Sequence, residues 1–373
     1  MWGRKALFGF AIGAAYFPGI PSAALMPRWW VLAISLPLIS RCDPRALRPG
    51  FMVCLLGVLV WGAAASILFS PHPHSAALEW YMLALLGLSA VAAAEEGGSE
   101  IILGLGWGVA VSAALCLPQS LGWSPVPQIT APAGLFLSSE VMAETAAPLL
   151  VWSIMDRRPA LAVLLLIPVV LCGSRTAALA AVVGLTVAWQ PRNGLWKFGL
   201  LAAVMVAGAA AMFVLGLAKA HSGMDRMVLW VAAVDSIVPF GRGLGWWAAG
   251  HPAGFEEFVH SDALQAVVEL GIGAAFLFVM PFAVLREIDH EDLALRSGFF
   301  AALVECVVSF PLHVPAAGFM VFALAGRLAR RRDSVRRHGF VGGICSVLRF
   351  RRAAAHLATM AARRRRDHPV VSL

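Results

Sequence analysis

The stretch that decides the fold is residues 259–273, VHSDALQAVVELGIG, which places a histidine, His260, immediately before an apolar helix. The predicted helix contains a carboxylate, Glu269, among residues that are otherwise mostly hydrocarbon. Lipid stabilises neither of these ionisable groups, so their presence at the end of an apolar segment indicates chemistry rather than packing. We therefore expect a functional site where this segment meets the membrane surface.

The rest of the chain has the composition of a polytopic membrane protein. Of its 373 residues, 60% are hydrophobic and 13% are charged, which is about half the charged share of a soluble domain. Long apolar runs recur from end to end, so we predict an all-α integral membrane helix bundle. The six cysteines are scattered singly and indicate neither a disulfide framework nor a metal site, and we expect no cofactor.

Hydropathy predicts about 12 transmembrane helices, several of them shorter than the roughly 20 residues that a perpendicular span needs. If the N-terminus is cytoplasmic and the spans alternate, only five of the 29 basic residues lie outside. The positive-inside rule favours this orientation, with both termini in the cytoplasm. The predicted spans are 6–25, 29–40, 50–70, 76–94, 100–117, 141–155, 159–172, 176–189, 198–217, 263–282, 297–311 and 313–326.

The segment 159–189 tests this predicted arrangement of spans across the membrane. A single long helix would bury Arg175 near the middle of the membrane, at a cost of about 2.5–3.5 kcal/mol or more. A hairpin that turns at Gly173-Ser174 instead lifts Arg175 to the outer surface and keeps both flanking basic loops inside. We therefore predict the hairpin.

The predicted domain organisation is a membrane domain over residues 1–326 followed by an arginine-rich cytoplasmic tail over 327–373. The membrane domain includes a periplasmic loop at about 218–262, in which residues 225–235 read as an interfacial helix. The tail contains 13 arginines. We expect it to bind anionic lipids of the inner leaflet and expect no nucleic acid partner.

Three of the few outer basic residues stand in distinctive settings: Arg175 at the hairpin tip, Arg226 at the start of the loop helix and Arg242 in a glycine-rich turn. The planar guanidinium group suits phosphate oxygens and stays charged near apolar surroundings. Arginines that converge on one face therefore indicate an anionic ligand, plausibly a phosphate at headgroup level. The alternative is that each one pairs with a carboxylate or extends to water.

His260 is the candidate acid–base group. Asp262 is expected to cap the helix that follows, which places His260 at a helix N-terminus. Glu269 is predicted about 10 Å deeper on nearly the same face, where it either orients His260 or an arginine or makes a purely structural hydrogen bond. His251 and His313 are expected on the same face and stay open as alternatives. Glu140 and Glu144 could hold a divalent cation, but no further ligand spacing supports a metal.

These residues also resemble a known family. Gly173-Ser174-Arg175-Thr176-Ala177, the run Arg226-Met227-Val228-Leu229-Trp230 followed by Gly243-Leu244-Gly245, and His260-Ser261 followed by Gly271 are similar to motifs of the O-antigen ligase, O-antigen polymerase and O-oligosaccharyltransferase superfamily. The resemblance covers about 130–325, in matching order and spacing. Ala274 stands where the family usually has glycine, and Ser138-Ser139 where it often has asparagine.

The resemblance implies a glycosyltransferase of the bacterial inner membrane. We expect it to be inverting and metal-independent, because in-line attack inverts the anomeric centre and arginines supply the charge. Members transfer a glycan from undecaprenyl diphosphate to a hydroxyl acceptor at the periplasmic face of the inner membrane. Carried over to matching positions, Arg175 and Arg226 would bind the donor diphosphate and His260 would activate the acceptor hydroxyl. From the residues themselves, we expect Arg242 to assist with the diphosphate and Asp262 and Glu269 to support His260. The expected acceptor is the lipid A core; a polysaccharide polymerase and a protein O-oligosaccharyltransferase are alternatives.

A different class, a transporter or flippase for an anionic lipid or solute, is favoured by one observation. Glu305 is predicted near the middle of a span, where transporters place ionisable residues. Against this class, the other charged candidates gather on one face and the two halves of the chain show no repeat.

Overall fold

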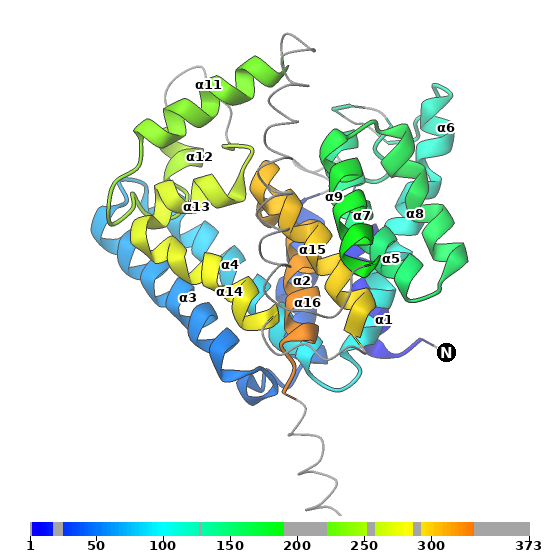
Figure 1. The fold of residues 1–373 in the computed structure, drawn as a ribbon, viewed down its shortest axis with the longest axis horizontal. Coiled ribbons are helices and arrows are strands. Elements are labelled where there is room, and N and C mark those ends of the chain that lie inside the picture. Colours follow the sequence, from blue (N-terminus) through cyan, green and yellow to red (C-terminus); the bar gives the residue numbers. More distant parts are fainter. Residues whose placement is uncertain are drawn as a thin grey trace, which may run out of the picture. The chain divides into compact units, whose positions relative to one another are not determined.

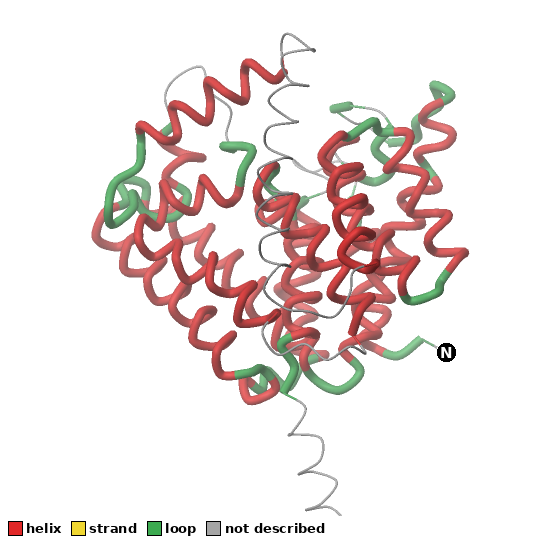
Figure 2. The backbone as a smooth tube through the Cα atoms, in the orientation of Figure 1, coloured by secondary structure: helices red, strands yellow, loops and turns green. Residues whose placement is uncertain are grey.

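The computed structural model describes residues 2–17, 25–126, 129–130, 132–136, 138–189, 222–251, 258–285 and 292–331. Within these ranges every regular element is a helix and none is a strand (Figures 1 and 2). The predicted all-α class is therefore confirmed. The predicted span at 198–217 lies outside the described residues.

The described helices are separated by segments of very different length. In chain order they are α1 (Arg4–Ala14), α2 (Met26–Ile39), η1 (Pro44–Ala46), α3 (Pro49–Phe69), α4 (Pro73–Ala94), α5 (Gly98–Ala114), α6 (Cys116–Ser120), α7 (Ser139–Met155), α8 (Pro159–Leu171), α9 (Arg175–Trp189), α11 (Ser222–Asp235), α12 (Trp246–Gly250), α13 (Asp262–Leu270), η2 (Gly271–Gly273), α14 (Ala274–Leu285), α15 (Leu293–Val308), η4 (Pro311–His313) and α16 (Pro315–Leu328).

Among the described residues, four helical segments are long and apolar enough to cross a membrane: Pro49–Phe69, Pro73–Ala94, Gly98–Ser120 and Asp262–Leu285. Shorter apolar helices accompany them at Met26–Ile39, Pro159–Leu171, Arg175–Val187 and Pro315–Leu328. Many large apolar side chains on these helices are exposed, as a lipid-facing surface requires. The chain therefore has the architecture of a helical membrane protein.

Helix boundaries agree with the sequence at some places and differ at others. The predicted turn at Gly173-Ser174 is confirmed, because α8 and α9 end and begin on either side of it. The span predicted at 313–326 begins two residues later, at Pro315. The proline restricts Val314 to an extended conformation, so the helix cannot include His313, which lies in the separate turn η4.

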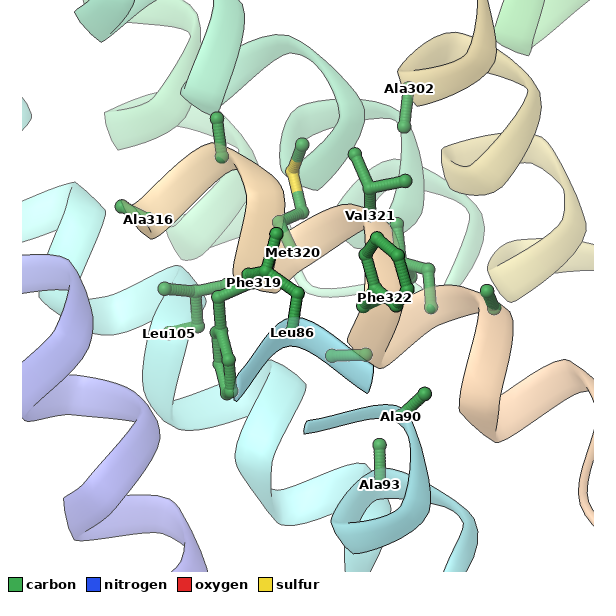
Figure 3. Packing of buried hydrophobic residues seen from close by; sticks show 14 of the residues in the cluster. Leu86, Ala90, Ala93, Leu105, Ala302, Ala316, Phe319, Met320, Val321 and Phe322 are labelled. Atoms are coloured by element: carbon green, nitrogen blue, oxygen red, sulfur yellow. The ribbon is translucent and has the colours of Figure 1, made fainter. Parts of the chain in front are cut away.

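The centre of the bundle is the contact between α16 and α4. Phe319, Met320 and Phe322 of α16 are buried beside Leu86 and Ala90 of α4, and Figure 3 shows these side chains packed together. Small residues of α4 and α16 let the two helices approach closely, as is usual where helices associate in lipid.

The contact between α1 and α5 depends on glycine. Gly9 and Gly13 of α1 face Gly104 and Gly108 of α5, each pair spaced four residues apart. A Cβ atom added at any of the four would collide with backbone atoms of the opposite helix. This is the small-residue packing that brings transmembrane backbones together.

Arg28, at the start of α2, is fully buried rather than exposed at a surface. Its guanidinium group donates to the carbonyl oxygens of Ile12 (2.9 Å) and Gly13 (3.2 Å) at the end of α1 and lies 4.0 Å from the ring centroid of Phe136. A cation suits the negative end of the α1 dipole, so Arg28 fastens α2 to α1.

The apolar segment 262–285 is a broken helix. The chain turns at Gly271, which has φ +55°, and resumes as α14 after η2. The indole nitrogen of Trp61 donates to the Leu270 carbonyl (2.7 Å), and the Ile272 amide donates to the Pro239 carbonyl (2.9 Å). These partners satisfy backbone groups that lipid could not, which is what allows a break within a span.

Gly104→Ala is expected to destabilise the bundle by about 1–3 kcal/mol, since its methyl group would overlap the Ala6 backbone. The matched control is Gly50→Ala, whose methyl would find ordinary contact with Ala283 at 3.7 Å. Thermal unfolding of the purified protein in detergent should show a lower midpoint for the first variant only. Equal midpoints would contradict the close contact of α1 and α5.

Candidate functional site

The start of α13 differs from the prediction in one respect. Ser261, not Asp262, is the N-cap: its hydroxyl oxygen accepts a hydrogen bond from the Leu264 amide (3.2 Å). Asp262 is the first residue of the helix and is buried, so the predicted capping role of Asp262 is wrong. The reason is that Ser261 is extended and its hydroxyl reaches the helix, while the Asp262 carboxylate has other partners.

Those partners belong to the junction between α15 and α16. Asp262 Oδ1 lies 2.8 Å from Nδ1 of His313, and Asp262 Oδ2 accepts from the Leu312 amide (2.8 Å). His313 Nε2 lies 3.9 Å from Oε2 of Glu79 on α4. Three elements distant in sequence therefore meet at His313, which sequence analysis placed on this face without a partner.

The carboxylates around His313 favour the protonated form of its imidazole. Burial lowers the pKa of His313, but the hydrogen bond to Asp262 and the negative charges of Glu79, Asp262 and Glu269 outweigh burial and raise it to about 9. A buried cation among carboxylates is stable only when it is paired, as it is here with Asp262. The pair therefore ties η4 to α13.

Glu269 and Gln265 extend this network along one face of α13. The Gln265 amide nitrogen donates to Glu269 Oε1 (3.2 Å) and lies 3.1 Å from His313 Nε2. Glu269 Oε1 also accepts from the Trp247 amide (3.2 Å). Glu269 is buried and accepts both of these hydrogen bonds. The contacts therefore support the alternative that Glu269 makes a structural hydrogen bond, rather than the alternative that it orients His260.

His260 has an unusual backbone conformation. Its φ of +55° is in the left-handed region, which a residue with a side chain seldom adopts. Its ring is half-buried and lies edge-on to Phe310, with 4.8 Å between the ring centroids. Strain of this kind costs about 1–3 kcal/mol and is typical of functional sites.

Arg226 lies beside the first turn of α7. Its guanidinium group pairs with Glu140 at 3.4 Å. One helical turn further, buried Glu144 accepts a hydrogen bond from the Ser309 hydroxyl at the end of α15 (2.7 Å). Ser309 in turn accepts through its carbonyl oxygen from the Asp262 amide (2.8 Å), so a line of contacts leads from Arg226 to the His260 loop.

Arg175 begins α9 and is exposed. The hydroxyl of Ser174 accepts from the Ala177 amide (3.3 Å), and Ala177 is buried in one cluster with Ala143 of α7 and Val308 of α15. The first turn of α9 therefore lies beside the same ends of α7 and α15 that contact the Arg226 and His260 segments. The structure thus gathers the elements that carry Arg175, Arg226 and His260 at one place.

Arg242 lies in the loop packed against the helix break. Its Nε donates to the Ser236 carbonyl (2.7 Å), and its guanidinium group lies 4.5 Å from the ring centroid of Trp246. The same loop donates from the Gly243 amide to the Glu269 carbonyl (2.9 Å). These contacts give Arg242 a role in holding the loop, which the sequence did not indicate.

Glu305 of α15 is fully buried, and neither of its carboxylate oxygens has a hydrogen-bond partner among the described residues. Oε1 of Glu144 likewise has no hydrogen-bond partner among the described residues. The two carboxyl groups are close enough to influence each other electrostatically. An ionisable residue at this depth in a helical membrane protein is costly and indicates function.

Two cavities adjoin Asp262. One of about 250 Å³ lies between α14, α15 and α16 and is lined mainly by apolar side chains, among them Phe278, Phe299 and Phe322. The other, about 60 Å³, is lined by Glu79, Gln265, Glu269 and His313 together with apolar residues. Asp262 lines both, so a small cavity that contains several polar side chains adjoins a larger apolar one at the start of α13.

In the described part of the chain, no group of three or more His, Cys, Asp and Glu side chains is arranged to hold a metal ion. A comparison with models of known protein families finds no match, and a comparison with curated proteins finds no significant one. The site is therefore interpreted from its own geometry and from the motifs described above.

Glu305→Met is expected to raise the melting temperature, because it removes a buried carboxyl group without a partner and keeps the volume of the side chain. Glu144→Met should lower it, since the Ser309 hydroxyl would lose its acceptor at a cost of about 1–3 kcal/mol. Thermal unfolding in detergent measures both. A fall for Glu305→Met would show that its carboxyl group has a stabilising partner.

Proposed function

We propose that this protein is a membrane glycosyltransferase that transfers a glycan from undecaprenyl diphosphate to an acceptor hydroxyl at the periplasmic face of the inner membrane. The observation that carries the proposal is the meeting of three segments at the ends of α7 and α15: the first turn of α9 with Arg175, the α11 segment with Arg226 and the strained loop with His260. Segments that carry one imidazole and two guanidinium groups suit a reaction that removes a proton while a diphosphate departs.

In the proposed reaction the acceptor oxygen attacks the anomeric carbon of the donor. The proton of the acceptor hydroxyl passes to His260, and the bond from the anomeric carbon to the diphosphate oxygen breaks with its electron pair staying on that oxygen. Arg175 and Arg226 stabilise the charge that develops on the leaving group, which can contribute several kcal/mol. Attack from the side opposite the leaving group inverts the anomeric centre.

The apolar cavity supports a lipid-linked donor. Its walls on α14, α15 and α16 are mainly hydrocarbon, which suits an isoprenoid chain, and Asp262 marks where the polar part of the site begins. Arg242 takes no part in the contact between Arg226 and α7. It donates a hydrogen bond to the Ser236 carbonyl, and its guanidinium group lies over the Trp246 ring. We assign it a supporting contact to the diphosphate.

For the acceptor we propose the lipid A core, which makes the protein O-antigen ligase-like. A growing polysaccharide or a protein hydroxyl would use the same donor chemistry and the same residues. In a deletion strain, loss of a ligase leaves bare core and accumulates lipid-linked polymer, whereas loss of a polymerase leaves single repeats on the core. A gel of the lipopolysaccharide distinguishes these outcomes.

A second candidate function, transport of an anionic lipid or solute, has its own support. Transporters build binding sites from discontinuous helices with ionisable residues inside the membrane. This chain has the break at Gly271 and the carboxyl group of Glu305, which has no hydrogen-bond partner within the described ranges. Uptake of substrate into proteoliposomes without glycan transfer would favour it.

His260→Ala is expected to lower the transfer rate by about 100- to 10,000-fold, the usual contribution of a general base. Arg226→Ala should lower it as well, because charge on the departing diphosphate would be less stabilised. Purified protein in liposomes, supplied with undecaprenyl diphosphate glycan and purified core lipid A, gives the rates, with and without a chelator. His74→Ala and Arg45→Ala, both at exposed positions outside the site, are the controls. Parental rates in both site variants would refute the mechanism.

Orientation gives a separate prediction. The residues at positions 45 and 74 are exposed, Arg45 before α3 and His74 in the first turn of α4. In a background without other cysteines, His74→Cys should react with an impermeant maleimide added to intact spheroplasts, and Arg45→Cys only after lysis. The reverse pattern would place the site in the cytosol and end the proposal.

A further inference from the structure

Both sides of His260 are held by hydrogen bonds. On one side, the Val259 amide donates to the Gln265 side-chain oxygen (3.3 Å) and the Val259 carbonyl accepts from the Trp230 indole (3.0 Å). On the other side, the Asp262 amide donates to the Ser309 carbonyl (2.8 Å). A left-handed backbone persists only when its surroundings fix it in this way.

His313 joins these restraints. It bonds to Asp262 at 2.8 Å and contacts the Gln265 amide at 3.1 Å, so it touches a residue on each of the two restraints. Its ring also packs against Phe258 (5.0 Å between centroids), which stacks on Phe310 (4.9 Å). Phe310 is the ring against which His260 lies, so His313 supports both the backbone and the side chain of His260.

We propose that His313 is a positioning residue for His260, acting through Asp262, Gln265 and the Phe258–Phe310 stack. The inference rests on the proposed function, since it assigns His313 to the same reaction. His313 does not exchange a proton with the acceptor, because Nδ1 is bonded to Asp262 and Nε2 faces Glu79 and Gln265.

The kinetic test uses His313→Ala and His313→Asn, whose amide nitrogen can still donate to Asp262. In the liposome assay, His313→Ala should lower kcat by about 100-fold, the effect of displacing a catalytic group by about 1 Å, with little change in KM. His313→Asn should restore most of kcat. Its pH profile across neutrality should keep the parental shape, because His313 is not the group that titrates there.

A second readout does not depend on the reaction. Diethyl pyrocarbonate modifies accessible imidazoles, and mass spectrometry of the peptide that contains His260 gives its modification rate. In the parental protein, packing against Phe310 should slow this rate; in His313→Ala the rate should rise severalfold, and in His313→Asn it should return toward the parental value. His74→Ala, outside the network, should leave it unchanged.

The outcomes separate the two proposals. If the parental protein transfers no glycan, the proposed function fails, while the modification rates still decide whether His313 positions His260. If His313→Ala leaves both kcat per folded molecule and the His260 modification rate unchanged, the positioning role is overturned. Should His313→Ala fail to fold, Gln265→Ala breaks the same network at the Val259 amide, and the same two results are expected of it.

Discussion

A bilayer offers no hydrogen-bond partner to a backbone group, and the break at Gly271 depends on partners supplied by the protein itself. The carbonyl of Leu270 and the amide of Ile272 would be unpaired inside an apolar segment if Trp61 and Pro239 did not reach them. Because the break stops α13 after nine residues, it keeps the polar face of that short helix apart from the hydrocarbon of α14. The arrangement of the site follows from that separation.

Charged side chains inside the bundle also need partners from the protein, because lipid supplies none. Arg28 and Asp262 are deeply buried and His313 is half-buried, and each has a partner that removes most of the cost of burial. Glu305 departs from this pattern, since its oxygens lack partners in the described ranges. A carboxyl group that is kept inside the bundle with neither oxygen hydrogen-bonded in the described ranges is retained for a reason other than stability.

Much of the fold could be predicted from the sequence, because apolar periodicity and proline positions act locally. The turn at Gly173-Ser174 and the helix over Ser222–Asp235 are examples. The pairing of Asp262 with His313 could not be predicted, because it joins residues 51 positions apart through packing that no local pattern records. The choice of Ser261 over Asp262 as the cap likewise depended on where the α15–α16 junction lies. The loop-holding contacts of Arg242 were missed for the same reason.

The bond between Trp61 and Leu270 spans 209 residues, which has a consequence for biosynthesis. At ordinary translation speed the ribosome needs roughly 10 to 40 s to make that stretch. Throughout this interval α3 is already in the membrane, but the Leu270 carbonyl that accepts the hydrogen bond from the Trp61 indole has not yet been made. The interrupted helix can therefore settle only after most of the chain has been made, so that the end of the bundle that carries His260 is completed late in synthesis.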